Sequence, residues 1–145
     1  MKIALRTTNS HGLKALFSIL TKWRLQTVFP HGGIVLGNTL THATLVDGVN
    51  EVTFDPAGWL VYDYPAVNDQ AAYERLDKFN EAKYDVFALL AFVLPWRISD
   101  SRRVYCFELM WAAMTGENPS FKVTPEMILA KILENPNPLV VNKHG

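Results

Sequence analysis

Cysteine and histidine are the residue types of this chain that could carry covalent chemistry. The chain has one cysteine, Cys106, and four histidines: His11, His31, His42 and His144. A cysteine nucleophile reacts as the thiolate, so it needs a nearby histidine or a helix N-terminus, and a polar group that orients the histidine. The chain therefore has the components of a nucleophilic cysteine site if its fold brings them together.

Ordinary structural roles compete with this interpretation. A lone cysteine on an amphipathic helix is usually a small buried hydrophobe, and this is the alternative for Cys106. His31 could simply be a turn residue, and His42 could face solvent from an alternating strand. His11 and His144 are assigned to the surface. The residue types alone do not choose between these roles.

Metal binding is not favoured for Cys106, His31 and His42. No CxxC, HxxxH or carboxylate cluster accompanies them, and a structural zinc ion needs four ligands. The single cysteine also excludes an intramolecular disulfide. We therefore expect neither a metal nor any other cofactor.

The two candidate histidines fall in a predicted β-hairpin. Residues 31–37 (HGGIVLG) and 40–46 (LTHATLV) are two β-rich runs separated by the turn Asn38-Thr39. With that turn Val35 lies opposite His42, on the face of the hairpin that also carries His31. The hairpin would then present two imidazoles to the end of a helix.

The helix that carries Cys106 is predicted to follow an N-cap cluster at residues 99–101. It runs to about Thr115 and stops at Gly116. Cys106 would then lie in the first two turns, where unpaired N–H groups and the helix dipole favour a negative charge. This position suits a thiolate.

The other predicted elements place these two segments in an α+β domain. Strands are expected at residues 1–7, 51–54 and 58–64, and helices at 13–23, from 68 or 69 to 79, at 84–94 and from 124 to 134. Strands in the first half and helices in the second predict a small antiparallel sheet packed on helices. We expect one domain over residues 1–136 and an extended C-terminal tail over residues 137–145.

The composition of the chain limits the classes of partner that it could bind. The chain has 145 residues, of which 49% are hydrophobic and 19% charged, and its formal net charge is zero. No basic field is available to hold a nucleic acid. The longest apolar run, residues 86–94, is too short for a transmembrane segment, and MKIALR does not resemble a signal peptide. We expect a product that is cytoplasmic as synthesised.

Four segments, taken in order, resemble the circularly permuted branch of the NlpC-type papain-like superfamily. This branch includes the YiiX-like proteins and the lecithin:retinol acyltransferase relatives. The matching segments are PHGGIVLG (30–37), His42 eleven residues after His31, Tyr84-Asp85, and YCFEL (105–109). The resemblance covers residues 1 to about 116. It departs at Phe107, where the family usually has serine, and at Lys83, where it often has a small residue or proline.

The resemblance implies a permuted papain-like fold and a role for each matching residue. Cys106 would attack an amide or ester carbonyl, His31 would take its proton and His42 would orient His31. Thr44 and Asp47 are the other candidates for the third role. Tyr105 would line the site, and backbone N–H groups near the helix start would bind the oxyanion.

Three functions follow as hypotheses. The first is a thiol amidase or endopeptidase acting on peptidoglycan peptides, since cell-wall cleavage is the commonest activity of the wider superfamily. The second is hydrolysis or transfer of a lipid or protein acyl ester. The third is a structural or docking subunit of a larger assembly, for example a phage tail, in which case the chain would be incorporated in a virion.

Overall fold

The computed structural model describes residues 1–7, 28–44, 47–80, 83–84, 103–135 and 140–143. The helix predicted over 13–23 lies outside these ranges, as do residues 85–94 of the helix predicted over 84–94. Within them the structure is α+β, as the sequence predicts, with a six-stranded sheet, a two-stranded ladder and three helices. None of the helices in these ranges is long and apolar enough to cross a membrane.

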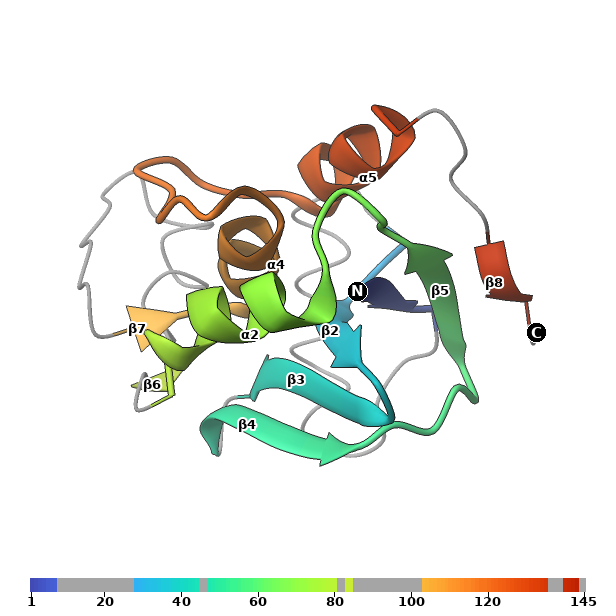
Figure 1. Cartoon of the computed structure of the whole chain (residues 1–145), viewed down its shortest axis with the longest axis horizontal. Coiled ribbons are helices and arrows are strands. Elements are labelled where there is room, and N and C mark those ends of the chain that lie inside the picture. The colour runs from blue at the N-terminus through green and yellow to red at the C-terminus, as the bar shows by residue number, and fades with distance from the viewer. Residues whose placement is uncertain (8–27, 45–46, 81–82, 85–102, 136–139, 144–145) are drawn as a thin grey trace.

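The main sheet is antiparallel throughout, with the strand order β4-β3-β2-β1-β5-β8 (Figure 1). Its strands are β1 (Lys2–Arg6), β2 (His31–Leu36), β3 (Thr39–Thr44), β4 (Gly48–Thr53), β5 (Trp59–Asp63) and β8 (Val140–Lys143). The predicted strands are therefore present. The tail expected to be extended contributes β8, which pairs with β5 at the edge of the sheet.

The β2–β3 turn differs from the prediction by one position. Leu36 pairs with Thr39 and Val35 with Leu40, so the turn residues are Gly37 and Asn38 rather than Asn38 and Thr39. Gly37 has a φ of 57°, in the left-handed region that glycine adopts without strain. The turn is thus set where the chain supplies a glycine.

Three helices accompany the sheet: α2 (Asp69–Asp77), α4 (Cys106–Thr115) and α5 (Pro125–Leu133). Asn68 caps α2 by accepting a hydrogen bond from the Ala71 N–H at 2.8 Å. Thr124 caps α5, with Pro125 at its first position, as the sequence predicts. Gly116 ends α4 in a left-handed conformation with φ 81°.

Two predicted boundaries near the cysteine are wrong. Tyr84 is not helical: it belongs to β6 (Lys83–Tyr84), which pairs in parallel with β7 (Arg103–Val104). Because β7 precedes Tyr105, α4 begins at Cys106 itself and not upstream of it. The cysteine is the first residue of its helix.

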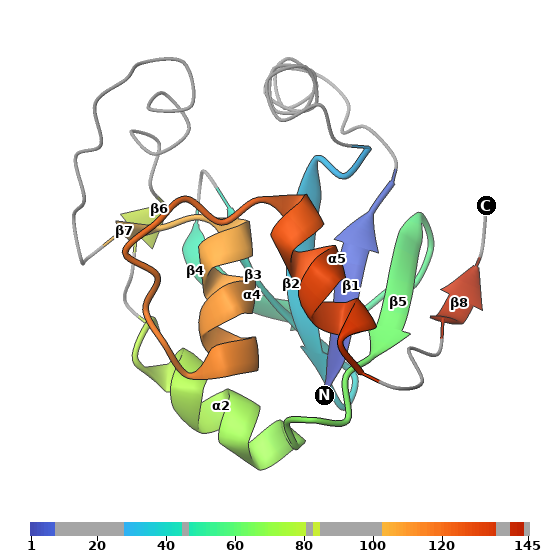
Figure 2. The same ribbon diagram turned by 90° about the horizontal axis from the view of Figure 1, so that it is seen from above.

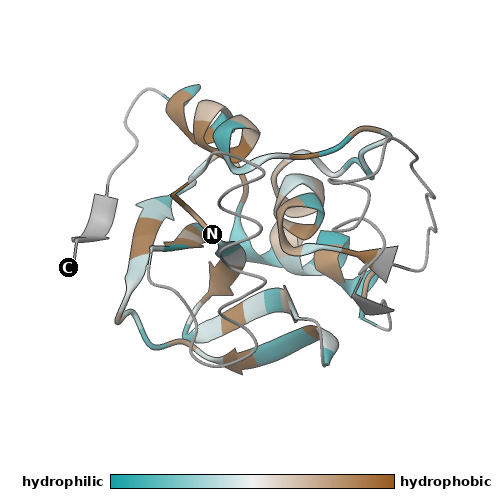
Figure 3. Ribbon diagram, turned by 180° about the vertical axis from the view of Figure 1, so that it is seen from behind, coloured by the Kyte–Doolittle hydropathy of each residue, from teal (hydrophilic) through white to brown (hydrophobic). Residues whose placement is uncertain are grey.

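The sheet packs on both faces. One face lies against the helices, and its core includes Ile3, Leu5 and Ile34 of the strands together with Phe107, Met110, Ile128 and Ile132 of α4 and α5. Figure 2 shows α4 and α5 in front of the strands, with α2 beside α4. The other face holds a smaller apolar cluster formed by Ala4, Val35, Leu40, Trp59 and Val61. Strands β1 and β2 are accordingly buried at successive positions, Ile3 to Leu5 and Gly32 to Val35; Figure 3 shows the hydropathy of the strands and helices along the ribbon.

Candidate functional site

His31 and His42 are in direct contact. His31 Nε2 and His42 Nδ1 are 3.0 Å apart, a hydrogen-bonding distance, and the ring centroids are separated by 5.1 Å. His31 is the first residue of β2, and His42 lies on β3. The structure thus brings together the two histidines that the hairpin prediction placed on one face.

The expected pairing of Val35 with His42 is wrong, yet the expected proximity is found. The observed register, continued by one residue past Ile34 and Thr41, puts Gly33 opposite His42. A Cβ on Gly33 would lie 3.1 Å from the Cβ of His42. The shift is two residues, and side chains alternate with a period of two, so His42 keeps its face.

The surroundings of His31 keep its imidazole neutral. Burial is the main cause, followed by the positive charges of His42 and Arg6, and together they lower the pKa of His31 to about 3. Trp59 lies beside the ring, with 5.8 Å between centroids, and the Arg6 guanidinium stacks over Trp59. Burial also lowers the pKa of His42. Both imidazoles are therefore uncharged bases at neutral pH.

Cys106 is buried at the N-terminus of α4, with 4% of its surface exposed. The backbone N–H groups of Gly32, Phe107 and Cys106 itself favour the thiolate and lower the pKa of the thiol. Burial has the larger effect and raises the pKa of the thiol to about 12. The helix N-terminus thus contacts the sulfur as the sequence suggests, but the proton stays on it.

The backbone of β2 separates the sulfur from the histidine pair. A Cβ on Gly32 would point at Met110 and Phe107 of α4, so Gly32 faces the helix. Since neighbouring strand residues face opposite sides, the His31 side chain projects away from α4. In the described part of the chain no hydrogen bond joins Cys106 to either imidazole. The sulfur nevertheless reaches the peptide unit next to His31, through the Gly32 N–H.

Tyr105 precedes the cysteine and holds a loop in place. It is 2% exposed, and its hydroxyl donates a hydrogen bond to the Val123 carbonyl at 2.7 Å. It also occupies the N-cap position of α4, where its side chain makes no capping hydrogen bond. The structure thus gives Tyr105 a packing contact beside the candidate nucleophile.

The two other candidates for the third role, Thr44 and Asp47, form a network with Asn50. The Thr44 hydroxyl lies 3.3 Å from the Asp47 carboxylate, and the Asp47 N–H donates to Thr44 Oγ1 at 3.2 Å. Asn50 Nδ2 donates to the same Thr44 oxygen at 3.4 Å. The ring that contacts His31 is that of His42.

Sequence reasoning did not single out Asn50, Gly32 or Arg6. Asn50 lies directly opposite His42 in the β3–β4 pairing, a register that the sequence alone did not specify. Gly32 was only one residue of the predicted strand 31–37, and Arg6 one residue of the predicted strand 1–7. Their importance depends on pairing between strands, which has no local signal.

No group of three histidine, cysteine, aspartate or glutamate residues that could hold a metal ion occurs within the described ranges. In comparisons with known proteins, no family model and no curated protein sequence matches the chain. The function must therefore be argued from the geometry of the site.

Proposed function

We propose that the protein is a cysteine-dependent amide hydrolase in which Cys106 is the nucleophile, His31 the general base and His42 the group that orients His31. The observation that carries the proposal is the 3.0 Å hydrogen bond between the two histidines, next to the Gly32 amide that contacts the thiol. Thiol catalysis needs an imidazole that a second polar group orients and a cysteine at a helix N-terminus; here both are present, on the two sides of the first residues of β2.

The chemistry begins with a proton transfer in step with attack. His31 takes the thiol proton while the Cys106 sulfur bonds to the carbonyl carbon, and the carbonyl π electrons move to oxygen. N–H groups of the first turn of α4 are suited to binding that oxyanion. The intermediate then collapses, the C–N bond breaks and His31 protonates the leaving amine.

The second half of the reaction regenerates the enzyme. Water attacks the thioester on Cys106 while His31 takes a proton from the water, and the carboxylic acid leaves as that proton returns to sulfur. His42 orients the ring through the hydrogen bond that joins the two histidines in the substrate-free protein. Because His31 and Cys106 project to opposite sides of β2 in that state, the proposed transfer requires the His31 ring to turn toward the sulfur when substrate binds.

The expected substrate class is a peptide amide of the bacterial cell wall, because of the family resemblance of residues 30–37 and 105–109. The test incubates the protein with purified peptidoglycan peptides and measures new amino groups. The wild type should release amines. Cys106→Ala should fold normally and release none, and His31→Ala should lower the rate by about 100-fold or more, the range of general acid–base catalysis.

The same assay with acyl esters of lipids or proteins shows which class of substrate the protein cleaves. Cleavage of esters without cleavage of wall peptides would contradict the amidase proposal and support an acyl hydrolase or acyltransferase. Trapping of a covalent acyl group on Cys106, detected as a mass increase that Cys106→Ala does not show, would support the nucleophile in either case.

A second candidate is a structural subunit that keeps the fold without activity. The observation in its favour is the protonated, buried thiol, which is typical of an inert structural cysteine. If it is correct, Cys106→Ala assembles with its partner as the wild type does, and no acyl group accumulates on the sulfur with any substrate tested.

A further inference from the structure

We propose that Asn50 is a positioning residue that fixes the tautomer of both histidines and so keeps His31 Nδ1 unprotonated. This inference rests on the proposed function, since it concerns how the base is prepared. It depends on three observations: the strand register, the hydrogen bonds of the Asn50 amide, and a buried oxygen that lacks a donor.

The strand register places Asn50 beside His42. In the antiparallel β3–β4 pair His42 is directly opposite Asn50, so both side chains lie on the same face of the sheet. That face is the one that carries His31, on the neighbouring strand β2. The three side chains thus form a row across β2, β3 and β4.

The hydrogen bonds of Thr44 determine which end of the Asn50 amide faces the histidine. The Thr44 hydroxyl has one proton, which is directed to the Asp47 carboxylate. Its oxygen can therefore only accept from Asn50, which turns the Asn50 NH₂ group toward Thr44 and the Oδ1 oxygen away from it.

The Oδ1 atom of Asn50 is buried and accepts no hydrogen bond from the described residues. A buried carbonyl oxygen without a donor is destabilising, because it has lost its hydrogen bonds to water. The Asn50 side chain is close enough to His42 to raise the pKa of that imidazole, opposing the effect of burial. His42 is directly opposite Asn50, and the proposal assigns its Nε2–H group as the donor to this oxygen.

The tautomers follow from that hydrogen bond. A neutral imidazole carries one proton, so a His42 ring with its proton on Nε2 has a bare Nδ1. Because His42 Nδ1 contacts His31 Nε2, the proton between them must belong to His31 Nε2. His31 Nδ1 is then unprotonated, as a base requires. The opposite tautomer of His42 would place a proton on His31 Nδ1 and block it.

NMR spectroscopy measures the tautomers directly. In the full chain with ¹⁵N-labelled histidine, two-bond proton–nitrogen correlations distinguish a ring with its proton on Nε2 from one with its proton on Nδ1. Single His31→Gln and His42→Gln variants assign the signals. Wild-type His31 and His42 should both carry the proton on Nε2. A proton on Nδ1 of either ring in the wild type would overturn the inference, whether or not the protein hydrolyses any substrate.

Two variants of Asn50 separate positioning from packing. Asn50→Leu removes the acceptor, so the His42 proton should move toward Nδ1 and hydrolysis should fall by at least about tenfold. Asn50→Asp keeps an oxygen acceptor, so it should retain the Nε2–H tautomers and recover part of the rate. Unchanged tautomers in a folded Asn50→Leu protein would contradict the inference.

The pH profile of Asn50→Asp provides a second readout. The titratable and charged groups around His42 are His31 on β2, Arg6 on β1 and Asp47, the residue directly before β4. An added carboxylate stabilises the His42 imidazolium, so the acid limb of the rate profile should move to higher pH. Asn118→Asp, the same substitution at an exposed position in the loop after α4, is the matched control and should leave the limb in place.

The two proposals fail separately. Nε2–H tautomers that depend on Asn50, together with no hydrolysis of any amide or ester, would uphold the positioning role and contradict the hydrolase. Hydrolysis that depends on Cys106 and His31, with tautomers indifferent to Asn50→Leu, would do the opposite.

Discussion

At the scale of single residues, the site is built from groups that are neutral at rest. The thiol of Cys106 and the imidazole of His31 are both held uncharged, mainly by burial, although backbone N–H groups contact the sulfur. A preformed thiolate–imidazolium pair would need the opposite shifts. If Cys106 acts as the proposed nucleophile, its proton must therefore leave during the attack and not before it.

This state has a direct consequence for the reactivity of Cys106. A thiol with a pKa of about 12 has far less thiolate at pH 8 than a free cysteine with a pKa of about 8.5, by a factor on the order of a thousand. Alkylation by iodoacetamide should therefore be slow in the native protein at pH 8 and become faster up to at least pH 10. The urea-unfolded chain serves as the control. Fast alkylation at pH 6 that is lost in His31→Ala would show a preformed ion pair instead.

The contact between His31 and His42 could be predicted from the sequence because only the parity of the hairpin matters. The turn was placed one residue late, which moves the partner of His42 by two positions, from Val35 to Gly33. A two-residue shift preserves the face of every side chain. Asn50 could not be found in this way, because its position opposite His42 depends on where β4 begins after the turn that contains Asp47.

At the scale of secondary structure elements, two adjacent glycines keep β2 close to its neighbours on both sides. A Cβ on Gly32 would collide with Met110 of α4, whereas a Cβ on Gly33 would lie 2.7 Å from Leu40 Cδ1 and 2.9 Å from the Thr41 carbonyl oxygen. The GG pair thus serves close packing of a helix on one face and of strand β3 on the other.

Alanine at these two positions should have different effects. Gly32→Ala should displace α4 and the sulfur and destabilise the fold by about 1–3 kcal/mol, as overpacking does. Gly33→Ala should instead push β3 away and break the contact between His31 and His42. Urea unfolding measures the first effect, and histidine ¹⁵N shifts measure the second. Normal histidine shifts in Gly33→Ala would contradict this assignment of faces.

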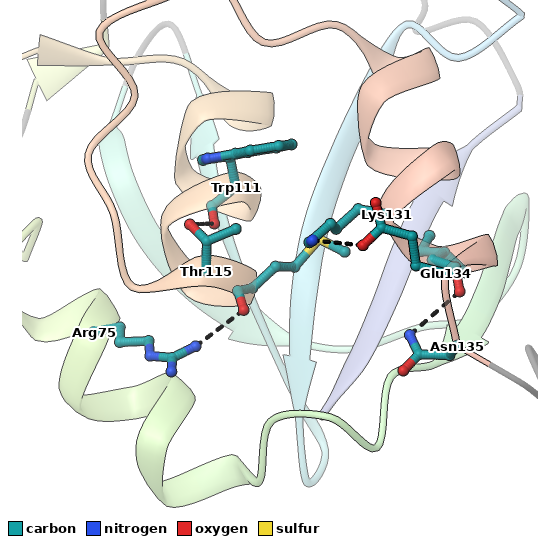
Figure 4. Close-up of polar contacts among 8 residues, drawn as sticks. Arg75, Trp111, Thr115, Lys131, Glu134 and Asn135 are labelled. Carbon is teal, nitrogen blue, oxygen red and sulfur yellow. Dashed lines mark hydrogen bonds and ion pairs between the residues drawn. The ribbon is translucent and has the colours of Figure 1, made fainter.

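Helix α4 is fixed at its C-terminal end by a side chain of α2. Arg75 Nη1 donates to the carbonyls of Ala113 and Met114 at 2.8 and 3.1 Å, close to the Gly116 cap; Figure 4 shows the Arg75 side chain reaching from α2 to the end of α4. Charged donors at the C-terminus of a helix satisfy open carbonyls and complement the helix dipole. The helix is thereby held in place at the end opposite Cys106.

Removal of this contact should weaken the fold. Arg75→Ala should lower the free energy of unfolding by about 1.5–3 kcal/mol, the range for hydrogen bonds to charged groups. Lys78→Ala, at an exposed position just after the same helix, is the matched control and should change it by less than about 0.5 kcal/mol. Equal effects of the two substitutions, measured by urea unfolding, would contradict the role of Arg75.

The elements themselves were largely predictable where a polar cap or a glycine marks an end. Asn68, Thr124 and Gly116 all act as the sequence indicates. The start of α4 was not predictable in this way, because its N-cap is Tyr105, whose side chain makes no capping hydrogen bond. A cluster of good cap residues at 99–101 suggested an earlier start, and the short β7 strand takes the place of that first turn.

At the scale of the whole molecule, the neutral site connects stability to pH on both sides. Below pH 6.5 the unfolded chain binds a proton at His31 that the native protein does not take up until about pH 3. Above pH 9 the unfolded chain loses the Cys106 proton that the native protein keeps to about pH 12. Stability should therefore be greatest between about pH 6.5 and 9 and fall in both directions.

Two variants test these limits separately. One differential proton changes stability by at most about 1.4 kcal/mol per pH unit. His31→Gln should flatten the decline between pH 6.5 and 3, and Cys106→Ala should flatten the decline above pH 9. The measurement is the urea concentration at the midpoint of unfolding, for the wild type and both variants across this pH range. A wild-type protein equally stable at pH 4.5 and pH 7.5 would contradict the prediction for His31.

The class of fold was predictable because most strands and most helices fall in separate parts of the chain. Strand patterns prevail over residues 31–64 and helical spacing over most of the chain after residue 65, which yields an α+β domain. The order of the strands could not be predicted from the sequence. Strand β1 pairs with both β2 and β5, and the last strand, β8, lies at the edge of the sheet beside β5. Such pairings join distant segments and have no local signature.

The central position of β1 also limits the order in which the sheet can form while the chain is being synthesised. Ala4 pairs with Gly33 on one side and with Val61 on the other, so the first strand gains both neighbours by the time β5 is made. The helices α4 and α5 that cover the sheet come later in the chain. A nascent chain therefore leaves the apolar face of Ile3, Leu5 and Ile34 without α4 and α5 until those helices have been synthesised.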